Sequence, residues 1–209
     1  VRGDWPVTQP ILKLEGIEKS FGRNNVLRGI DLDVAPGQSL VVIGGSGSGK
    51  SVMLKVALGL MTPTAGKVLF DGHDVTSSTG KTRESMRARI GMLFQAGALF
   101  DSLTVWENVA FRLINADGVK RGQAKERAIE TLKKVRLGAD VANLYPAEIS
   151  GGMQKRVSLA RSIISEPDLI FFDEPTTGLD PITADAINDL IIEQVRGLGR
   201  ADGPIQPAI

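Results

Sequence analysis

The chain has 209 residues, of which 42% are apolar and 23% are charged, and its formal net charge is +1. These values are typical of an ordinary domain with a core of its own, and without a basic block they give no reason to expect a nucleic-acid partner. Cysteine is absent, which excludes disulfides and thiolate metal sites. No apolar run reaches the roughly 20 residues that a membrane-spanning helix needs, so we expect no direct membrane span.

The first part of the chain has the pattern of strands joined by turns. Residues 11–17 alternate apolar and polar side chains, as a half-buried strand does, and residues 26–34 repeat this character. Pro36-Gly37 interrupts the pattern, and the apolar run at 39–43 then predicts a short buried strand. Residues 52–58 are expected to form a helix.

A glycine-rich loop lies between this strand and this helix. Its sequence is Gly44-Gly45-Ser46-Gly47-Ser48-Gly49-Lys50-Ser51, which fits the pattern G-x-x-x-x-G-K-[ST] at every fixed position. Small residues let backbone N–H groups point at phosphates, and the new helix adds the positive end of its dipole. Lys50 supplies a cation for the β and γ phosphates, and Ser51 offers a hydroxyl to Mg²⁺. The alternative is a flexible connector, but the context favours a nucleoside triphosphate site.

Further elements follow in chain order. Residues 67–70 predict a strand entering a hairpin at Asp71-Gly72, residues 76–82 a polar connector, and residues 90–94 another short strand. Residues from about 104 to 165 are helical in pattern, with two apolar stripes: Ala124, Ala128, Leu132 and Val135, then Met153, Val157, Ala160 and Ile164. An apolar run at 169–172 predicts a strand covered on both faces, and a last helix is marked by Ile187, Leu190, Ile191 and Val195.

Two acidic residues directly follow the strand at 169–172. Side chains at the carboxyl end of a parallel strand face the crevice in which such sheets bind ligands. We therefore predict that Asp173 holds Mg²⁺ and that Glu174 polarises a water for in-line attack on the γ-phosphate. The alternative is that these residues only form a solvated strand end before Pro175. The phosphate loop earlier in the chain favours the catalytic interpretation.

A second glycine motif, Ser150-Gly151-Gly152-Met153-Gln154, begins the helix that carries the second apolar stripe. Ser150 stands where an N-cap belongs, and bare N–H groups and a positive dipole end follow it. The motif thus predicts a second anion site made by Ser150, Gly151 and Gly152. An ordinary helix cap is the alternative, which only the whole set of motifs can exclude.

Five motifs in this order resemble those of the ATP-binding cassette (ABC) ATPases, over roughly residues 11–198. They are the phosphate loop, Gln95 after a short strand, the Ser150 motif, the strand ending in Asp173-Glu174, and Gly178-Leu179-Asp180. The resemblance implies an α/β fold, that of a P-loop NTPase of the ABC type. Such a nucleotide-binding domain has an antiparallel β subdomain and a helical subdomain, the latter expected at about 96–165.

The resemblance also implies roles for the matching residues. Phe21 matches the aromatic that stacks on adenine, and a position in the hydrophobic core is an equally favoured alternative for it. Gln95 matches the glutamine that contacts Mg²⁺ and the attacking water and senses the membrane partner. Glu174 matches the catalytic base, and Lys50 the phosphate-loop lysine.

Two further matches concern a pair of chains. Ser150 and Gly152 match the signature motif, which contacts the γ-phosphate bound to the opposite subunit, and Asp180 matches the loop that links the paired sites. The family works as head-to-tail dimers with ATP and Mg²⁺ at the interface. The expected partners are thus a second copy of this chain and an integral membrane permease.

A narrower resemblance is to the ATPase of Mla-type transporters, which move phospholipids between the inner and outer membranes of Gram-negative bacteria. It rests on residues 92–100, on the Met153-containing signature and on residues 178–183. It implies a cytoplasmic protein, peripheral on the inner membrane. The apolar residues at 97–100, with Leu103, Val105 and Trp106, lie where the family receives a short permease helix, and the alternative for them is packing within the helical subdomain.

The resemblance fails after the last helix. The family continues with an apolar strand that ends in a histidine, whereas residues 197–209 have two prolines, three glycines and no histidine. His73, just past a turn, is expected to be a solvated hairpin residue. We therefore expect a truncated or frame-shifted form with a non-family tail at 199–209. The alternative functions are an ABC ATPase for another solute class, such as amino acids or ions, and a truncated ATP-binding form without turnover.

Overall fold

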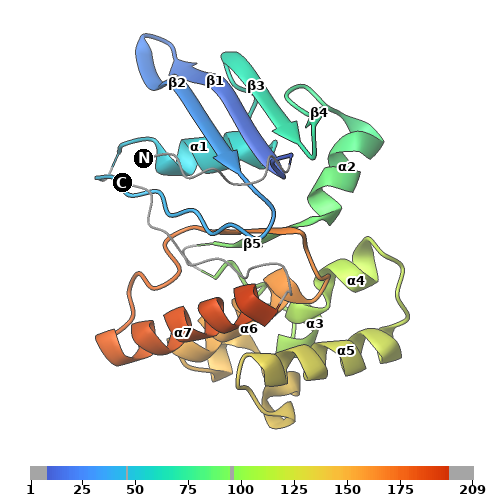
Figure 1. Ribbon diagram of the computed structural model, residues 1–209. Coiled ribbons are helices and arrows are strands. Elements are labelled where there is room, and N and C mark those ends of the chain that lie inside the picture. Colours follow the sequence, from blue (N-terminus) through green and yellow to red (C-terminus); the bar gives the residue numbers. More distant parts are fainter. Residues whose placement is uncertain (1–8, 46, 95–96, 198–209) are drawn as a thin grey trace. The chain divides into compact units, whose positions relative to one another are not determined.

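The structure, a computed structural model, describes residues 9–45, 47–94 and 97–197 (Figure 1). The described residues divide into two units, one up to Ala88 and the other from Arg89 to Gly197, and each has its own sheet and helices. Within the described residues, no helix combines the length and the apolar character needed to cross a membrane. The tail expected at 199–209 lies outside these residues, and the subdomain bounds expected from the sequence stay a prediction.

An antiparallel sheet is the framework of the first unit, as the resemblance implied. Its strand order is β2-β1-β3-β4, and the strands are β1 (Leu12–Phe21), β2 (Asn24–Val34), β3 (Ala65–Phe70) and β4 (His73–Asp74). Alternation sets the buried face of β1, because Leu12 and Leu14 are buried and the residue between them is only half-buried. Helix α1 (Lys50–Ala57) packs against β1 and β2 and buries Met53 and Val56. The predicted strands at 11–17 and 26–34 and the predicted helix at 52–58 are confirmed.

The predicted hairpin at Asp71-Gly72 is also confirmed. Both residues have positive φ, 50° and 75°, as a two-residue turn between twisted antiparallel strands requires. His73 follows in β4 with an exposed side chain, as expected. The polar connector predicted at 76–82 is shorter than expected, because α2 (Gly80–Ala88) begins inside it. This helix buries only Met86, so its sequence lacks the apolar period by which helices are recognised.

The buried strand predicted at 39–43 is absent from the structure. No strand is assigned there, and Val41, Val42 and Ile43 are 43%, 42% and 75% exposed. A strand exists only where a neighbouring strand completes its hydrogen bonds, and the four strands of the first unit pair among themselves. Apolar composition alone was therefore insufficient at this position.

The second unit has a parallel strand pair surrounded by helices. Strand β5 (Ile90–Leu93) pairs with β6 (Leu169–Phe172) in register, which confirms both predicted strands. The sequence predicted that β6 is covered on both faces, but all its residues are only half-buried. Within the described residues, β5 is the one strand that pairs with it. The helices are α3 (Val105–Val109), α4 (Phe111–Asn115), α5 (Arg121–Lys134), α6 (Gly151–Ile163) and α7 (Pro181–Gly197), with short 3₁₀ turns at Ala139–Asn143 and Pro146–Glu148.

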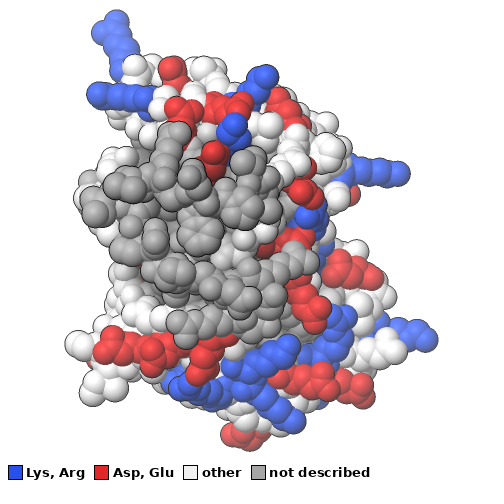
Figure 2. All heavy atoms as spheres, in the orientation of Figure 1, with Lys and Arg blue, Asp and Glu red and all other residues white. Residues whose placement is uncertain are grey.

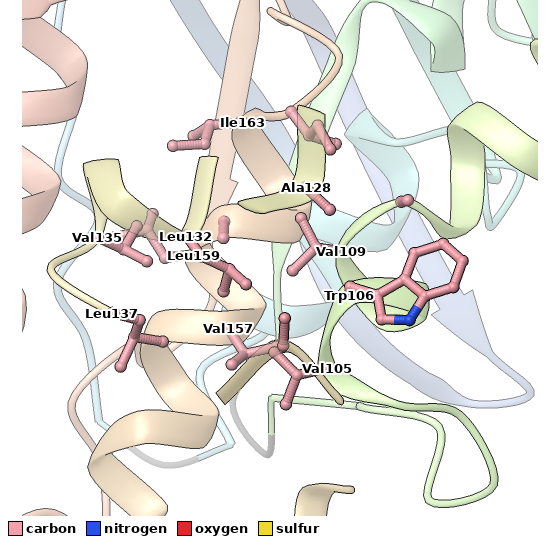
Figure 3. Packing of buried hydrophobic residues seen from close by; sticks show 14 of the residues in the cluster. Val105, Trp106, Val109, Ala128, Leu132, Val135, Leu137, Val157, Leu159 and Ile163 are labelled. Atoms are coloured by element: carbon pink, nitrogen blue, oxygen red, sulfur yellow. The ribbon is translucent and has the colours of Figure 1, made fainter. Parts of the chain in front are cut away.

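The core of the second unit lies between these helices (Figure 3). The stripe predicted on α5 is confirmed, since Ala124, Ala128, Leu132 and Val135 have no exposed surface. On α6, Val157, Ala160 and the following Ile164 are buried, and Met153 is half-buried against the same cluster. Gly91 of β5 lets α6 approach, because a Cβ there would lie 2.3 Å from the carbonyl oxygen of Ser162. Helix α6, which begins at the Ser150 motif, therefore packs closely against β5 and the core of the second unit.

Charged side chains of both signs are interspersed on the face shown in Figure 2. In the second unit, Arg136 pairs with Glu193 at 2.6 Å, and both side chains are about half exposed. Thr104 and Glu107 form a capping box at the start of α3, and hydrogen bonds from Thr104, then from Arg121, hold the pKa of Glu107 below its usual range. These contacts order the helix ends near the 97–104 loop.

Candidate nucleotide-binding site

In the first unit, the phosphate-binding pattern occupies the loop that enters α1. Gly49 caps the helix with φ 94°, and its carbonyl accepts a hydrogen bond from the N–H of Met53 at 2.8 Å. The Lys50 ammonium donates to the carbonyl oxygens of Gly44 and Gly45, at 2.5 and 3.0 Å. The lysine thus lies over its own loop, where its charge would be close to the phosphates of a nucleotide bound at the helix N-terminus. Ser46 lies outside the described residues.

The glycines of this loop leave space that side chains would fill. A Cβ at Gly44 would lie 2.7 Å from Ser48 Oγ, and one at Gly49 would lie 3.0 Å from Leu27 Cδ2 and 3.1 Å from Val26 Cγ1. Strand β2 therefore supports the beginning of α1 directly. This close backbone fits the triphosphate of ATP, which the loop would hold through its N–H groups.

Replacing Gly49 with alanine is expected to weaken Mg·ATP binding about tenfold, because a side chain in left-handed backbone costs about 1–2 kcal/mol. The new methyl would also press on Val26 and Leu27. Isothermal titration with Mg·ATP measures the effect. Gly122→Ala is the control, since its Cβ would meet open space on α5. Equal affinities for both variants would contradict the expectation.

Phe21 stands at the end of β1, where the chain turns into β2. Its side chain is 48% exposed, and the Lys19 ammonium lies 5.4 Å from its ring centroid. This exposure rules out the alternative of a core aromatic. Stacking on adenine stays a prediction.

In the second unit, Asp173 and Glu174 follow β6 directly. The N–H of Asp173 donates to the carbonyl of Leu93 at 3.0 Å, which extends the parallel ladder by one step beyond β6. Glu174 then turns out of the strand with φ 46°, and its exposed carboxylate accepts a hydrogen bond from Thr177 Oγ1 at 3.1 Å. The two carboxylates therefore have different local settings, one half-buried on the strand and one on a strained turn.

Ser150 caps α6 as its position in the motif predicts. Its Oγ accepts a hydrogen bond from the N–H of Met153 at 3.3 Å, and its carbonyl accepts one from Gln154 at 2.9 Å. Gly151 is exposed, and a Cβ there would meet no atom within 4 Å. The cap and a helix of 13 residues make an open, positively polarised turn.

Asp180 precedes α7 directly, and Thr183 of that helix lies between Asp180 and the Ser150 turn. Its Oδ1 accepts a hydrogen bond from the Thr183 N–H at 3.0 Å, with Pro181 in the first helical position. Hydrogen bonds from the side chain and the backbone of Thr183 hold the pKa of Asp180 below its usual range. The methyl of Thr183 faces Gly152, because a Cβ at Gly152 would lie 2.9 Å from it. Thr183 therefore lies between two predicted site residues.

The apolar residues predicted to receive a permease divide into two groups. Val105 and Trp106 belong to the core of the second unit, as the packing alternative expected. Phe100 is 44% exposed, Leu99 and Leu103 are half-buried, and the Phe100 ring packs 4.6 Å from that of Phe111. Of the residues predicted to contact a permease, only those before α3 therefore remain candidates.

The predicted site residues fall into two sets. Phe21 and the phosphate loop belong to the first unit; the Ser150 turn, Asp173, Glu174 and Asp180 belong to the second, and Gln95 lies outside the described residues. The donors predicted for Mg²⁺ that the structure describes, the Ser51 hydroxyl and the Asp173 carboxylate, are the hard oxygen ligands that this ion prefers. Sequence reasoning missed Thr183, whose only signal is its place three residues after a capping aspartate.

A family model described as "ABC transporter" matches residues 27–177 of this chain. The chain belongs to the ABC transporter family. The fold agrees with a solved dimeric structure of the ATP-binding cassette MJ0796 in a post-hydrolysis state with ADP and Pi: the TM-score is 0.81 at 32% identity, over 91% of this chain and 85% of that one. This chain therefore carries the nucleotide-binding ATPase domain of ABC transporters.

Curated ABC relatives have various names. The chain is 39% identical over 182 residues to the probable ribonucleotide transport ATP-binding protein mkl of Mycobacterium leprae, covering 87% of this chain and 52% of the relative. It is 41% identical over 188 residues to the chloroplastic protein TRIGALACTOSYLDIACYLGLYCEROL 3 of Arabidopsis thaliana, with coverages of 87% and 54%. It is 42% identical over 192 residues to the methionine import protein MetN of Corynebacterium diphtheriae, with coverages of 90% and 56%. This ABC chain thus spans about half the length of these relatives, whose names refer to different compounds.

Proposed function

We propose that this chain is the ATP-binding and ATP-hydrolysing subunit of a bacterial ABC transporter that moves phospholipid between membranes. Two copies would pair head to tail, bind two Mg·ATP at their interface, and drive a permease from the cytoplasmic face of the inner membrane. The observation that carries the proposal is the presence of both halves of such a site on one chain, within the ABC family. One half is the phosphate loop at α1, and the other is the open Ser150 turn at α6.

The Ser150 turn supports pairing because it offers backbone N–H groups that could bind the phosphate of a nucleotide held by another chain. Gly151 is exposed with open space around it, so the γ-phosphate of a partner's nucleotide could approach the backbone N–H groups. The dimeric structure of MJ0796 is of a relative at 32% identity. A head-to-tail pair would place one chain's phosphate loop opposite the other chain's turn.

Hydrolysis would use the residues that follow β6. Glu174 would orient the attacking water, with its carboxylate held by the Thr177 hydroxyl, and Lys50 would stabilise charge on the transferred phosphoryl group. Bound Mg²⁺ would supply further positive charge at the phosphates. Because Asp173 and Glu174 differ in burial, we assign metal binding to the former and water activation to the latter.

The phospholipid part of the proposal rests on two weaker observations. Residues 92–100 and 178–183 resemble those of Mla-type ATPases, and one relative at 41% identity is named after a glycerolipid. Permease contact is assigned to the exposed side chains Phe94 and Phe100, with Leu99 between them in sequence. Side-chain hydrogen bonds to the backbone of Gly97, Ala98 and Phe100 hold the part of this segment that carries Leu99 and Phe100.

Copurification tests the cargo. The tagged chain is expressed with its neighbouring genes, and the complex is analysed for subunits and for lipids by mass spectrometry. We expect a permease, a lipid-binding partner and bound phospholipid. Copurification with a soluble amino-acid receptor and no lipid would instead favour solute import, the function in the name of MetN. ATP binding without phosphate release in that complex would support the form without turnover.

A further inference from the structure

The loop at residues 97–104 is fixed to α6 by two side chains that the nucleotide site does not use. Ser158 Oγ donates to the carbonyl of Gly97 at 2.8 Å. The Arg161 guanidinium donates to the carbonyls of Gly97 at 2.8 Å and of Ala98 at 2.7 Å. Three hydrogen bonds from one helix face thus meet two successive carbonyls, and two of them come from a charged donor.

The backbone at these carbonyls has positive φ, which is unfavourable at Ala98. Gly97 has φ 74° and Ala98 has φ 47°, which is rare for a residue with a side chain. Such a conformation persists only where surrounding contacts impose it. Here the contacts come from α6, so the shape of the loop depends on Ser158 and Arg161.

The far end of the same loop is held from α3. Asn108 is fully buried, and its side chain accepts from the N–H of Phe100 at 2.8 Å and donates to the carbonyls of Phe100, Leu103 and Thr104 at 3.0 to 3.1 Å. Hydrogen bonds therefore hold both ends of the loop, from α6 and from α3, and Phe100 is exposed on it. A displacement of Phe100 would therefore reach Gly97 and the contacts with α6.

We propose that Arg161, assisted by Ser158, is a positioning residue that couples the 97–104 loop to the ATP-contacting turn at the start of α6. The proposal rests on the proposed function, in which the permease contacts this loop and the Ser150 turn contacts ATP. Helix α6 is a continuous rod, and from Ser150 to Arg161 it spans about 16 Å at 1.5 Å per residue. Movement of the loop is thereby passed to the turn, and ATP binding at the turn is passed back to the loop.

Burial gives this contact its strength. Arg161 is half-buried, and burial lowers the pKa of its guanidinium, so its charge needs the carbonyl oxygens around it. Methionine in its place would keep the alkyl packing and remove every donor. Lysine would keep the charge and lose the fork that meets two carbonyls at once.

Amide hydrogen exchange of the full chain tests the coupling, with and without Mg²⁺ and a non-hydrolysable ATP analogue. In the wild type we expect the analogue to slow exchange at residues 97–104. In Arg161→Met, exchange in this loop should be about 10- to 100-fold faster, the factor expected for lost charge-assisted hydrogen bonds, and the response to nucleotide should vanish. Arg161→Lys should recover part of both effects. Affinity for the analogue should change less than about twofold, because Arg161 is not among the predicted nucleotide-contacting residues and its hydrogen bonds go to Gly97 and Ala98.

Arg136→Met is the matched control, since it removes an arginine of the same unit from an exposed ion pair with Glu193. It should leave the loop unchanged. Exchange in Arg161→Met that equals the wild type at 97–104, or that rises throughout the second unit, overturns the proposal. If Arg161→Met has no melting transition, Ser158→Ala decides by the same measurement. A wild-type chain that fails to bind the analogue contradicts the proposed function, while loop exchange without nucleotide still decides the role of Arg161.

Discussion

Replacing Glu174 with glutamine is expected to slow ATP hydrolysis by about 10²- to 10⁴-fold, the usual contribution of a general base, while ATP binding is retained. Glutamine has the same shape and can still accept the hydrogen bond from Thr177, but it is not basic enough to take a proton. Phosphate release measures hydrolysis, and filter binding of labelled ATP measures affinity. The paired state should accumulate, since the nucleotide that holds it is not consumed.

Glu166→Gln is a demanding control for this substitution. Glu166 is also exposed and has φ 49°, close to the 46° of Glu174, but it precedes β6 instead of following it. The control removes the same charge from a similar backbone and should keep wild-type hydrolysis. An active Glu174→Gln variant would show that another group activates the water, and the assignment of the base would be wrong.

Local chemistry explains which features could be predicted from the sequence. Asp71-Gly72, the Ser150 cap and the glycine loop are each specified by residues next to one another, and the structure shows the hairpin, the cap and the positive φ of Gly49. The apolar stripe on α5 needs only its own period. Where neighbouring residues contain all the information, pattern and structure agree.

The features that were missed depend on partners far away in the sequence. Residues 39–43 have the composition of a strand, but a strand also needs a neighbouring strand to pair with. Composition does not indicate whether such a neighbour is present. Arg161 reaches Gly97 across 64 residues, so no local pattern could indicate the contact. Thr183 likewise meets Gly152 only because α6 and α7 pack together.

The contact between Thr183 and Gly152 leads to the second large effect. Gly152→Ala is expected to lower ATP hydrolysis about 100-fold, because a displacement near 1 Å of a binding turn can have this effect. The added Cβ would lie 2.9 Å from Thr183 Cγ2, so the turn, α7 or the Thr183 side chain must shift. Rotating Thr183 would relieve the clash, but it would also move the hydroxyl that faces Asp180. Overpacking of this kind also reduces the free energy of unfolding by about 1–3 kcal/mol, which thermal melting detects.

Thr183→Ser provides the decisive comparison, because serine keeps the hydroxyl near Asp180 and lacks the methyl that faces Gly152. In a double-mutant cycle, Thr183→Ser alone should have a small effect, and in the Gly152→Ala background it should restore most of the stability and hydrolysis. Gly151→Ala separates the two functions of the turn: its Cβ meets open space within the chain, so it should melt like the wild type yet weaken hydrolysis if a partner's phosphate approaches there. If the effects of Gly152→Ala and Thr183→Ser simply add, the two residues are not in energetic contact. The link from the Ser150 turn to Asp180 would then have to follow another path.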